Sequence, residues 1–378
     1  MDNSKLMEVI DVLSVEELER LQLFLQSPLF NAGPQAAELA LLLQHIREGM
    51  REKEAVYERL YPDTPFSRSK FDKLMSALLK HIHRFILLDQ NRPDQELAER
   101  FQLLHFFRER GLERHYQSIL KKLEKQLEAA GPKEGLSYWQ FLLKEERVTY
   151  QAAKNLRSDD LHVPDLLHQL DRFYLLSKLK YSVLLLSQNI HISLNVEDSL
   201  QMLEALMPVL EGPEFEADPP LQAFQQAYQL LRKHPAQDTH AEFLELRRQL
   251  RKNGHLLATD THKMLHSLLR IHAVSLYNAG RQDFLQAAFE LYQEHLKLGY
   301  LYYEGKLQPS TFRNIVTLGL RFGALEWVEQ FLTAHQARIT GTEYSEELFS
   351  FNRAQLYFFQ KRYDEALDQL ADKYVELY

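Results

Sequence analysis

The sequence predicts an all-α protein, with a small N-terminal helical domain followed by a stack of helical hairpins. Three observations predict this fold class. Helix-favouring Leu, Glu, Gln, Ala, Lys and Arg are abundant, whereas Gly and Pro number only 13 each in 378 residues. Apolar residues recur at helical spacing along most of the chain. Short polar or glycine-bearing turns separate these stretches, as antiparallel helix pairs require.

The first 92 residues predict a helical domain of their own. Ser14 and Glu17 form a capping box for a helix that ends before Pro28. Further helices are expected from about Gln35 to Gly49 and from Glu52 to Leu60. The turn YPDTPFS then leads into a long helix, which the segment QNRPDQE closes. The apolar stripe of that helix comprises Phe71, Leu74, Leu78, Ile82, Phe85 and Ile86.

Residues 93–378 predict a succession of helices, each roughly 14 to 20 residues long. Caps are expected at Asn195 with Asp198 and at Thr239 with Glu242. Only IHISLNV (190–196) alternates like a strand, and it is too short to form a sheet. Breaks are expected at GP (131–132), HVP near residue 161, EGPEFEADPP (211–220), KHPAQD (233–238), KNGH (252–255) and LQPS (307–310).

Three segments near the C-terminus align with one another at a spacing of about 40 residues, a period typical of helical solenoids. They begin at Ile271, Phe312 and Phe351. Each combines an apolar first helix, a tight turn at Gly280, Gly323 or Lys361, and a second helix that opens with an aromatic residue or Leu. An earlier, degenerate copy turns at Gly111.

The last segment resembles a tetratricopeptide (TPR) repeat, since small and aromatic residues occupy positions that the motif uses for packing between helices. These are Ala354, Tyr357, Tyr363 and Ala366. Leu370 stands where an aromatic residue is common, and Lys373 where a small one is usual. The resemblance covers about the last hundred residues. It implies that residues 93–378 form a TPR-like, right-handed superhelix of about six to eight hairpins.

Three further segments are similar to uncharacterised helical-repeat proteins of Bacteroidota bacteria. They are SPLFN (27–31), LYPDTPF (60–66) and RNIVTLGLRFGALEWVEQFL (313–332). This similarity spans most of the chain. It implies a helical-repeat fold and carries no known activity with it.

Composition and charge restrict the class of function. The formal net charge of −8 repels a phosphate backbone, and the absence of cysteine excludes disulfides and thiolate metal sites. The N-terminus has no basic segment followed by an apolar one, and no apolar run approaches the roughly 20 residues of a membrane span. We therefore expect a cytoplasmic protein that does not enter a membrane.

The sequence contains no recognisable catalytic constellation. Neither a GxSxG nucleophile motif nor a GxxxxGK or GxGxxG phosphate loop occurs. Carboxylate pairs such as Glu145 with Glu146 are adjacent and diverge on a helix, so they do not converge on one substrate atom. We expect a non-enzymatic protein without a cofactor, and an enzyme with an unfamiliar site is the least favoured alternative.

Histidines and basic runs offer two further hypotheses. His262 and His266 have the i, i+4 spacing of metal ligands, but Lys263 stands where an HExxH motif has Glu, so we expect no metal site. The run Arg247, Arg248, Arg251 and Lys252 suits the negative end of a helix dipole. The second functional hypothesis is a nucleic-acid-associated regulator that binds through the N-terminal domain. It requires a basic face formed by Arg68, Lys70, Lys73, Lys80 and Arg84.

The leading hypothesis is a protein- or peptide-binding adaptor that uses the concave groove of a helical solenoid. Tyrosines cluster between Gly299 and Gly305, and tyrosine is a common anchor in protein interfaces. The candidate partner-binding residues are Tyr300, Tyr302, Tyr303, Arg313, Asn314 and Tyr357. The final KYVELY is apolar where a solenoid needs a capping repeat, so we expect either a fragment of a longer protein or an end that docks on a neighbour.

Overall fold

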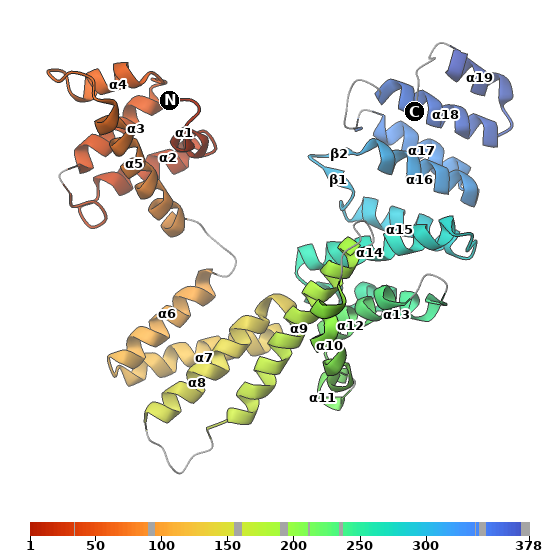
Figure 1. Ribbon diagram of the computed structural model, residues 1–378, viewed down its shortest axis with the longest axis horizontal. Coiled ribbons are helices and arrows are strands. Elements are labelled where there is room, and N and C mark those ends of the chain that lie inside the picture. The colour runs from red at the N-terminus through yellow and green to blue at the C-terminus, as the bar shows by residue number, and fades with distance from the viewer. Residues whose placement is uncertain are drawn as a thin grey trace. The chain divides into compact units, whose positions relative to one another are not determined.

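The computed structural model describes residues 1–33, 35–89, 95–154, 161–189, 196–210, 212–233, 237–336, 338–339 and 345–371. These residues are almost entirely helical (Figure 1), which confirms the predicted all-α fold class. The chain divides into two compact units, Met1–Gln102 and Leu103–Tyr378. The predicted domain boundary after residue 92 lies in segment 90–94, outside the described residues.

The Met1–Gln102 unit is built around one long helix. Its elements are α1 (Lys5–Ile10), α2 (Val15–Gln26), α3 (Ala36–Arg47), α4 (Lys53–Leu60), α5 (Arg68–Asp89) and the first part of α6 (Gln95–Glu109). Helices α2 to α5 lie where the sequence predicts them. The capping box of α2 is also confirmed, because the Glu17 N–H donates to Ser14 Oγ (3.2 Å) and the Ser14 N–H donates to the Glu17 carboxylate (2.7 Å). The predicted stripe of α5 is buried against α1, α2 and α3, except that Ile86 is only partly buried. Helix α1 was not predicted.

The Leu103–Tyr378 unit continues α6 and adds the remaining elements. They are α7 (Glu113–Ala130), η1 (Glu134–Leu136), α8 (Ser137–Ala153), α9 (Val163–Asn189), α10 (Glu197–Leu210), α11 (Pro213–Glu216), α12 (Pro219–Arg232), α13 (His240–Asn253), η2 (Gly254–Leu256), α14 (Thr259–Asn278), α15 (Phe284–Lys297), β1 (Tyr302–Tyr303), β2 (Lys306–Leu307), α16 (Pro309–Phe322), α17 (Leu325–His335), α18 (Ser345–Phe359) and α19 (Tyr363–Ala371). No helix among the described residues combines the length and apolar composition that a membrane crossing needs.

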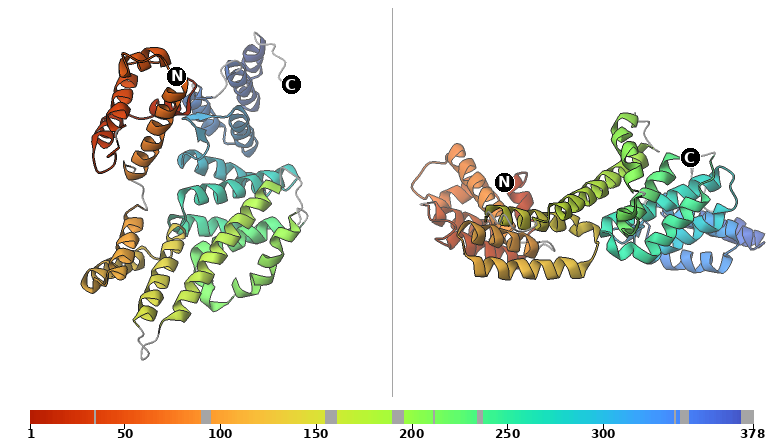
Figure 2. Two further views of the ribbon diagram at one scale, coloured as in Figure 1. Left: turned by 60° about the vertical axis from the view of Figure 1, so that its left-hand side comes forward. Right: turned by 90° about the horizontal axis from the view of Figure 1, so that it is seen from below.

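Helices that follow one another in the chain pack side by side in this unit (Figures 1 and 2). Helix α9 departs from the simple pairing, since it packs on both α8 and α12. It has 27 residues, more than the sequence led us to expect, because neither Gly nor Pro occurs between Asp165 and its end. The arrangement is compatible with a helical-repeat fold, and the right-handed superhelix stays a prediction.

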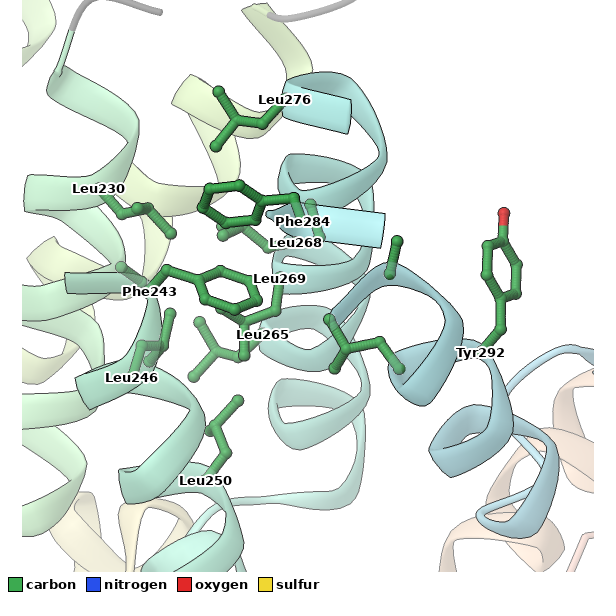
Figure 3. Close-up of a cluster of buried hydrophobic side chains, with 14 of the residues drawn as sticks. Leu230, Phe243, Leu246, Leu250, Leu265, Leu268, Leu269, Leu276, Phe284 and Tyr292 are labelled. Carbon is green, nitrogen blue, oxygen red and sulfur yellow. The ribbon is translucent and has the colours of Figure 1, made fainter. Parts of the chain in front are cut away.

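A continuous apolar core joins α9 to α18. In Figure 3, Leu230 of α12 and Phe243 and Leu246 of α13 lie toward Leu265 and Leu269 of α14. Because each helix buries a stripe of such residues against its neighbours, the stability of this unit rests on packing between helices.

Left-handed residues close the predicted hairpin turns. Gly280, Gly323 and Gly111 have φ values of 98°, 84° and 66°, and Lys361 has a φ of 63°. The sequence predicted a tight turn at each of these positions, and all four are confirmed. Lys361 carries a Cβ in a backbone region that favours glycine.

Replacing Lys361 by glycine is therefore expected to stabilise the protein. We expect Lys361→Gly to raise the free energy of unfolding by about 0.5–1 kcal/mol, because glycine adopts this φ without steric cost. Urea denaturation measures the change, and Gly323→Ala, which adds a Cβ at a left-handed turn, should shift stability the opposite way. A Lys361→Gly variant no more stable than the original chain would contradict this account of the turn.

One local prediction was wrong, and one element was not predicted. Thr239 stands at the N-cap of α13, but its side chain does not cap the helix. It is 1% exposed, and its Oγ1 lies 2.9 Å from Nε2 of His272 on α14, while Glu242 pairs with Lys233 instead. The hairpin of β1 and β2 was also not expected. It turns through Glu304 and Gly305, whose φ values are 50° and 77°.

Several predictions concern residues that the structure does not describe. The IHISLNV segment lies outside the described residues except at its last position, and Asn195, the expected cap, lies there too. The same holds for residues 234–236 of the KHPAQD break and for the terminal KYVELY. These predictions are untested.

Candidate functional site

The predicted tyrosines lie at and beside the β1–β2 hairpin. The hydroxyl of Tyr300 is 2.6 Å from Nδ1 of His262, and the hydroxyl of Tyr302 is 2.8 Å from Nε2 of His335. Tyr303 is 67% exposed. Two of the three phenols thus have histidine partners, and only Tyr303 presents most of its ring to solvent.

The other predicted partner-binding residues differ in their surroundings. Arg313 and Asn314 are exposed near the start of α16. Tyr357 is 8% exposed, its hydroxyl accepts a hydrogen bond from Arg353 Nε (3.0 Å), and the Arg362 guanidinium lies 4.3 Å from its ring centroid. The ring of Tyr357 therefore serves mainly to pack α18.

An apolar groove lies between α18 and α19, with a volume of about 540 Å³. We call it the α18–α19 groove. Its lining consists of Phe351, Ala354, Gln355, Phe358, Phe359, Tyr363, Ala366, Leu367 and Leu370. Phe358, Tyr363 and Leu367 are 60%, 54% and 64% exposed. Large apolar side chains exposed together in one concave feature mark a binding surface more often than single exposed residues do.

The exposure of this aromatic cluster corrects a prediction. The TPR resemblance implied that Tyr357 and Tyr363 pack between helices, and Tyr357 does so. Tyr363 instead faces the groove, together with Phe358 and Phe359. Helix α18 uses Leu348, Phe349 and Leu356 to join the main core and also packs against α19, while Phe358 and Phe359 remain exposed.

Acidic side chains border the groove on α19. Tyr363, Leu367 and Leu370 recur at i, i+4 and i+7 and form one stripe. Asp364 and Asp368 are exposed one position further along the helix, directly beside that stripe. Asp364 and Asp368 do not line the groove, but helical spacing places them next to its α19 wall.

The basic residues of the nucleic-acid hypothesis lie exposed on α5, and several make intramolecular contacts. Arg68 pairs with Asp72 (3.7 Å), the Lys70 ammonium lies 3.3 Å from the centroid of the Tyr61 ring, and Arg84 donates to the Phe30 carbonyl (3.4 Å). In the second basic run, Arg247 bonds to Glu290 (2.7 Å) and Glu294 (2.8 Å), and Arg248 to Glu245. Binding of nucleic acid stays an untested prediction.

The two histidines with metal-ligand spacing meet a third. The rings of His262 and His266 are 4.4 Å apart between centroids, and His295 on α15 lies 5.5 Å from His266. Within the described ranges, no group of three or more His, Cys, Asp or Glu side chains could hold a metal ion. Nothing in the sequence links His295 to this pair, because the helices that carry them meet only in the folded chain.

No protein-family model, no curated protein and no solved structure matches the chain. The similarities to TPR repeats and to helical-repeat proteins of Bacteroidota thus rest on sequence motifs, while the structure supports the broader statement that the chain is compatible with a helical-repeat fold.

Proposed function

We propose that this chain is an adaptor that binds an amphipathic helix of a partner protein in the α18–α19 groove. The observation that carries the proposal is the exposure of Phe358, Tyr363 and Leu367 in one apolar groove of about 540 Å³. A helix that lays its apolar face into such a groove uses residues at i, i+3 or i+4, and i+7.

Packing within the chain supports a helix as the occupant. Helix α18 packs on both α16 and α17, the two helices of the preceding hairpin. A partner helix would add the same kind of contact to the α18–α19 hairpin. Because Asp364 and Asp368 edge the groove, the favoured partner carries Lys or Arg beside its apolar stripe.

Selection from a library of displayed peptides tests the proposal without assuming a partner. Enriched peptides are expected to have apolar residues at helical spacing with basic neighbours, and to bind with dissociation constants on the order of 10 µM. Fluorescence anisotropy then compares each peptide with a version in which Glu replaces its Lys and Arg. We expect the acidic version to bind about tenfold more weakly at low salt.

Substitutions in the groove locate the site. Leu367→Asp and Phe358→Asp are each expected to weaken binding about tenfold or more, because either places a charge against the apolar face of the peptide. Both side chains are exposed, so the fold should persist. Leu244→Asp is the matched control, since Leu244 is 48% exposed on α13, away from the groove residues. Peptides that bind both groove variants as tightly as the original chain would exclude the groove as the site.

Two other occupants would give different results. If a second copy of the chain filled the groove, sedimentation would detect a dimer that Leu367→Asp converts to a monomer. If residues 372–378 filled it, a variant that ends at Ala371 would bind the selected peptides about tenfold more tightly. Either result would overturn the proposal of a partner helix.

A further inference from the structure

A second cavity, of about 660 Å³, lies where η2, α14 and the end of α15 meet. We call it the histidine pocket. Leu250, Leu257 and Leu298 give it apolar walls, while His262, His266 and Tyr300 contribute two imidazoles and a phenol. None of these residues lines the α18–α19 groove, so the pocket is independent of the proposed function.

One ring nitrogen of the buried His266 side chain makes no hydrogen bond to the described residues. His266 is 3% exposed and lines the pocket, and the nitrogen in question is Nδ1. A buried ring nitrogen that makes no hydrogen bond is costly to the fold. Burial lowers the pKa of His266 to about 4, so the ring is neutral near pH 7.

The neighbouring histidine is held in a defined orientation. Nδ1 of His262 lies 2.6 Å from the Tyr300 hydroxyl, and the rest of its ring packs against Gly254. A Cβ at position 254 would lie 2.3 Å from His262 Nε2, so only glycine leaves room for this ring. Gly254, His262 and Tyr300 therefore hold one another in place on the polar side of the pocket.

Positive charge dominates the mouth of the pocket. Lys297 is exposed at the end of α15, and Arg251 is exposed at the end of α13. Glu294 also lines the pocket, but Arg247 and Arg251 both bond to its carboxylate. With the charge of Glu294 shared between two arginines, Lys297 remains available to an anion.

From these features we propose that the histidine pocket binds a carboxylate joined to an apolar body, with Lys297 at the carboxylate, the three leucines around the body and the neutral His266 ring beside the ligand. This chemistry is shared by small organic acids and by the C-terminal residue of a peptide. The free acid and the peptide are therefore separate arms of the test.

Histidine-detected NMR with ¹⁵N-labelled protein provides the readout. Phenylacetate is the free-acid probe, and a tetrapeptide that ends in phenylalanine with a free carboxylate is the peptide probe. Each has its neutral amide as a control. At least one carboxylate is expected to shift the His266 ring resonances in a saturable way, with a dissociation constant on the order of 1 mM. Its amide should bind about tenfold more weakly.

The probe that binds more tightly identifies the source of the carboxylate. Tighter binding of phenylacetate supports a free acid, and tighter binding of the tetrapeptide supports a peptide C-terminus. Absence of a saturable shift with every carboxylate, or equal binding of acids and amides, would overturn the proposal.

Charge reversal at the mouth supplies matched variants. Lys297→Glu is expected to weaken binding of the carboxylate about tenfold or more. Lys263→Glu makes the same change at an exposed position of α14 that does not line the pocket, and should leave binding nearly unchanged. Equal effects of the two variants would show that the protein's general charge, and not the pocket, attracts the anion.

Tyr300→Phe adds a test that does not depend on charge. Loss of the phenol hydroxyl removes the partner of His262 Nδ1, so the His262 resonances should move in the free protein. The affinity for the carboxylate should fall less than in Lys297→Glu. If affinity depended on Tyr300 and not on Lys297, the assignment of the carboxylate to the mouth would be wrong.

Discussion

The chain is expected to lose about 5 kcal/mol of unfolding free energy when the pH falls from about 7 to about 5. The three histidines with the largest pKa shifts, all in the Leu103–Tyr378 unit, account for most of this loss, and the pKa values of His81, His262 and His335 are lowered as well. Burial lowers the pKa of His266 to about 4, of His272 to about 4 and of His295 to about 3. Nearby cations add to the effect, Arg247 and Arg251 at His266 and Arg270 at His295, whereas Glu294 opposes it.

The direction follows from proton binding. Below the ordinary histidine pKa of 6.5 the histidines of the unfolded chain bind protons, whereas the buried histidines of the folded chain stay neutral. Unfolding therefore becomes more favourable as the pH falls. The stability is complete above 6.5 and is lost progressively down to the folded-state values of about 4 and about 3. Each histidine contributes about 1.4 kcal/mol per pH unit within that window. Carboxylates with lowered pKa values lose their contribution only at lower pH, whereas the buried Glu146, whose pKa is raised by desolvation, opposes the histidine effect.

Urea denaturation at several pH values measures this effect. His295 is 0% exposed, so His295→Phe and His295→Gln both remove a buried titrating group. Both variants should reduce the pH dependence by about one third, whatever their stabilities at neutral pH. His115→Gln, at an exposed ring of the same unit, is the control. Unchanged pH dependence in both His295 variants would contradict burial as the cause.

Arg172→Met is expected to lower the free energy of unfolding by about 3–5 kcal/mol. Arg172 on α9 is 5% exposed, and its guanidinium donates to the Asp218 carboxylate, to Gln140 Oε1 (3.1 Å) and to the Pro132 carbonyl (2.9 Å). Asp218 also caps α12 by accepting from the Leu221 N–H (3.2 Å). One side chain thus joins α8, α9, α12 and the turn before η1.

The cost arises because Arg172→Met leaves Asp218 buried and uncompensated. Adding Asp218→Asn removes that charge and retains the helix cap, so the double variant should recover about 1 kcal/mol or more relative to Arg172→Met alone. Arg232 is the control, since it also contacts two carboxylates, Glu197 and Glu204, but at the surface. Arg232→Met should cost less than about 1 kcal/mol. A double variant less stable than Arg172→Met would refute the uncompensated charge as the cause.

The sequence by itself determined the all-α class, most helix boundaries in the first 89 residues and the hairpin turns. These features depend on residues within a few positions of one another. The Ser14–Glu17 cap, the apolar stripe of α5 and the left-handed turns at Gly280 and Lys361 are all of this kind. Local rules fail where a distant partner competes, as at Thr239, which contacts His272 and does not cap its own helix.

Only the tertiary structure decided which side chains form the two candidate sites. Phe349 and Phe358 lie on the same helix and are both aromatic, yet one joins the core and the other is exposed in the α18–α19 groove. His262 and His266 meet His295 because α14 packs against α15. These contacts could not be predicted from the sequence, because they depend on which faces of two helices meet. The packing of the whole unit determines those faces.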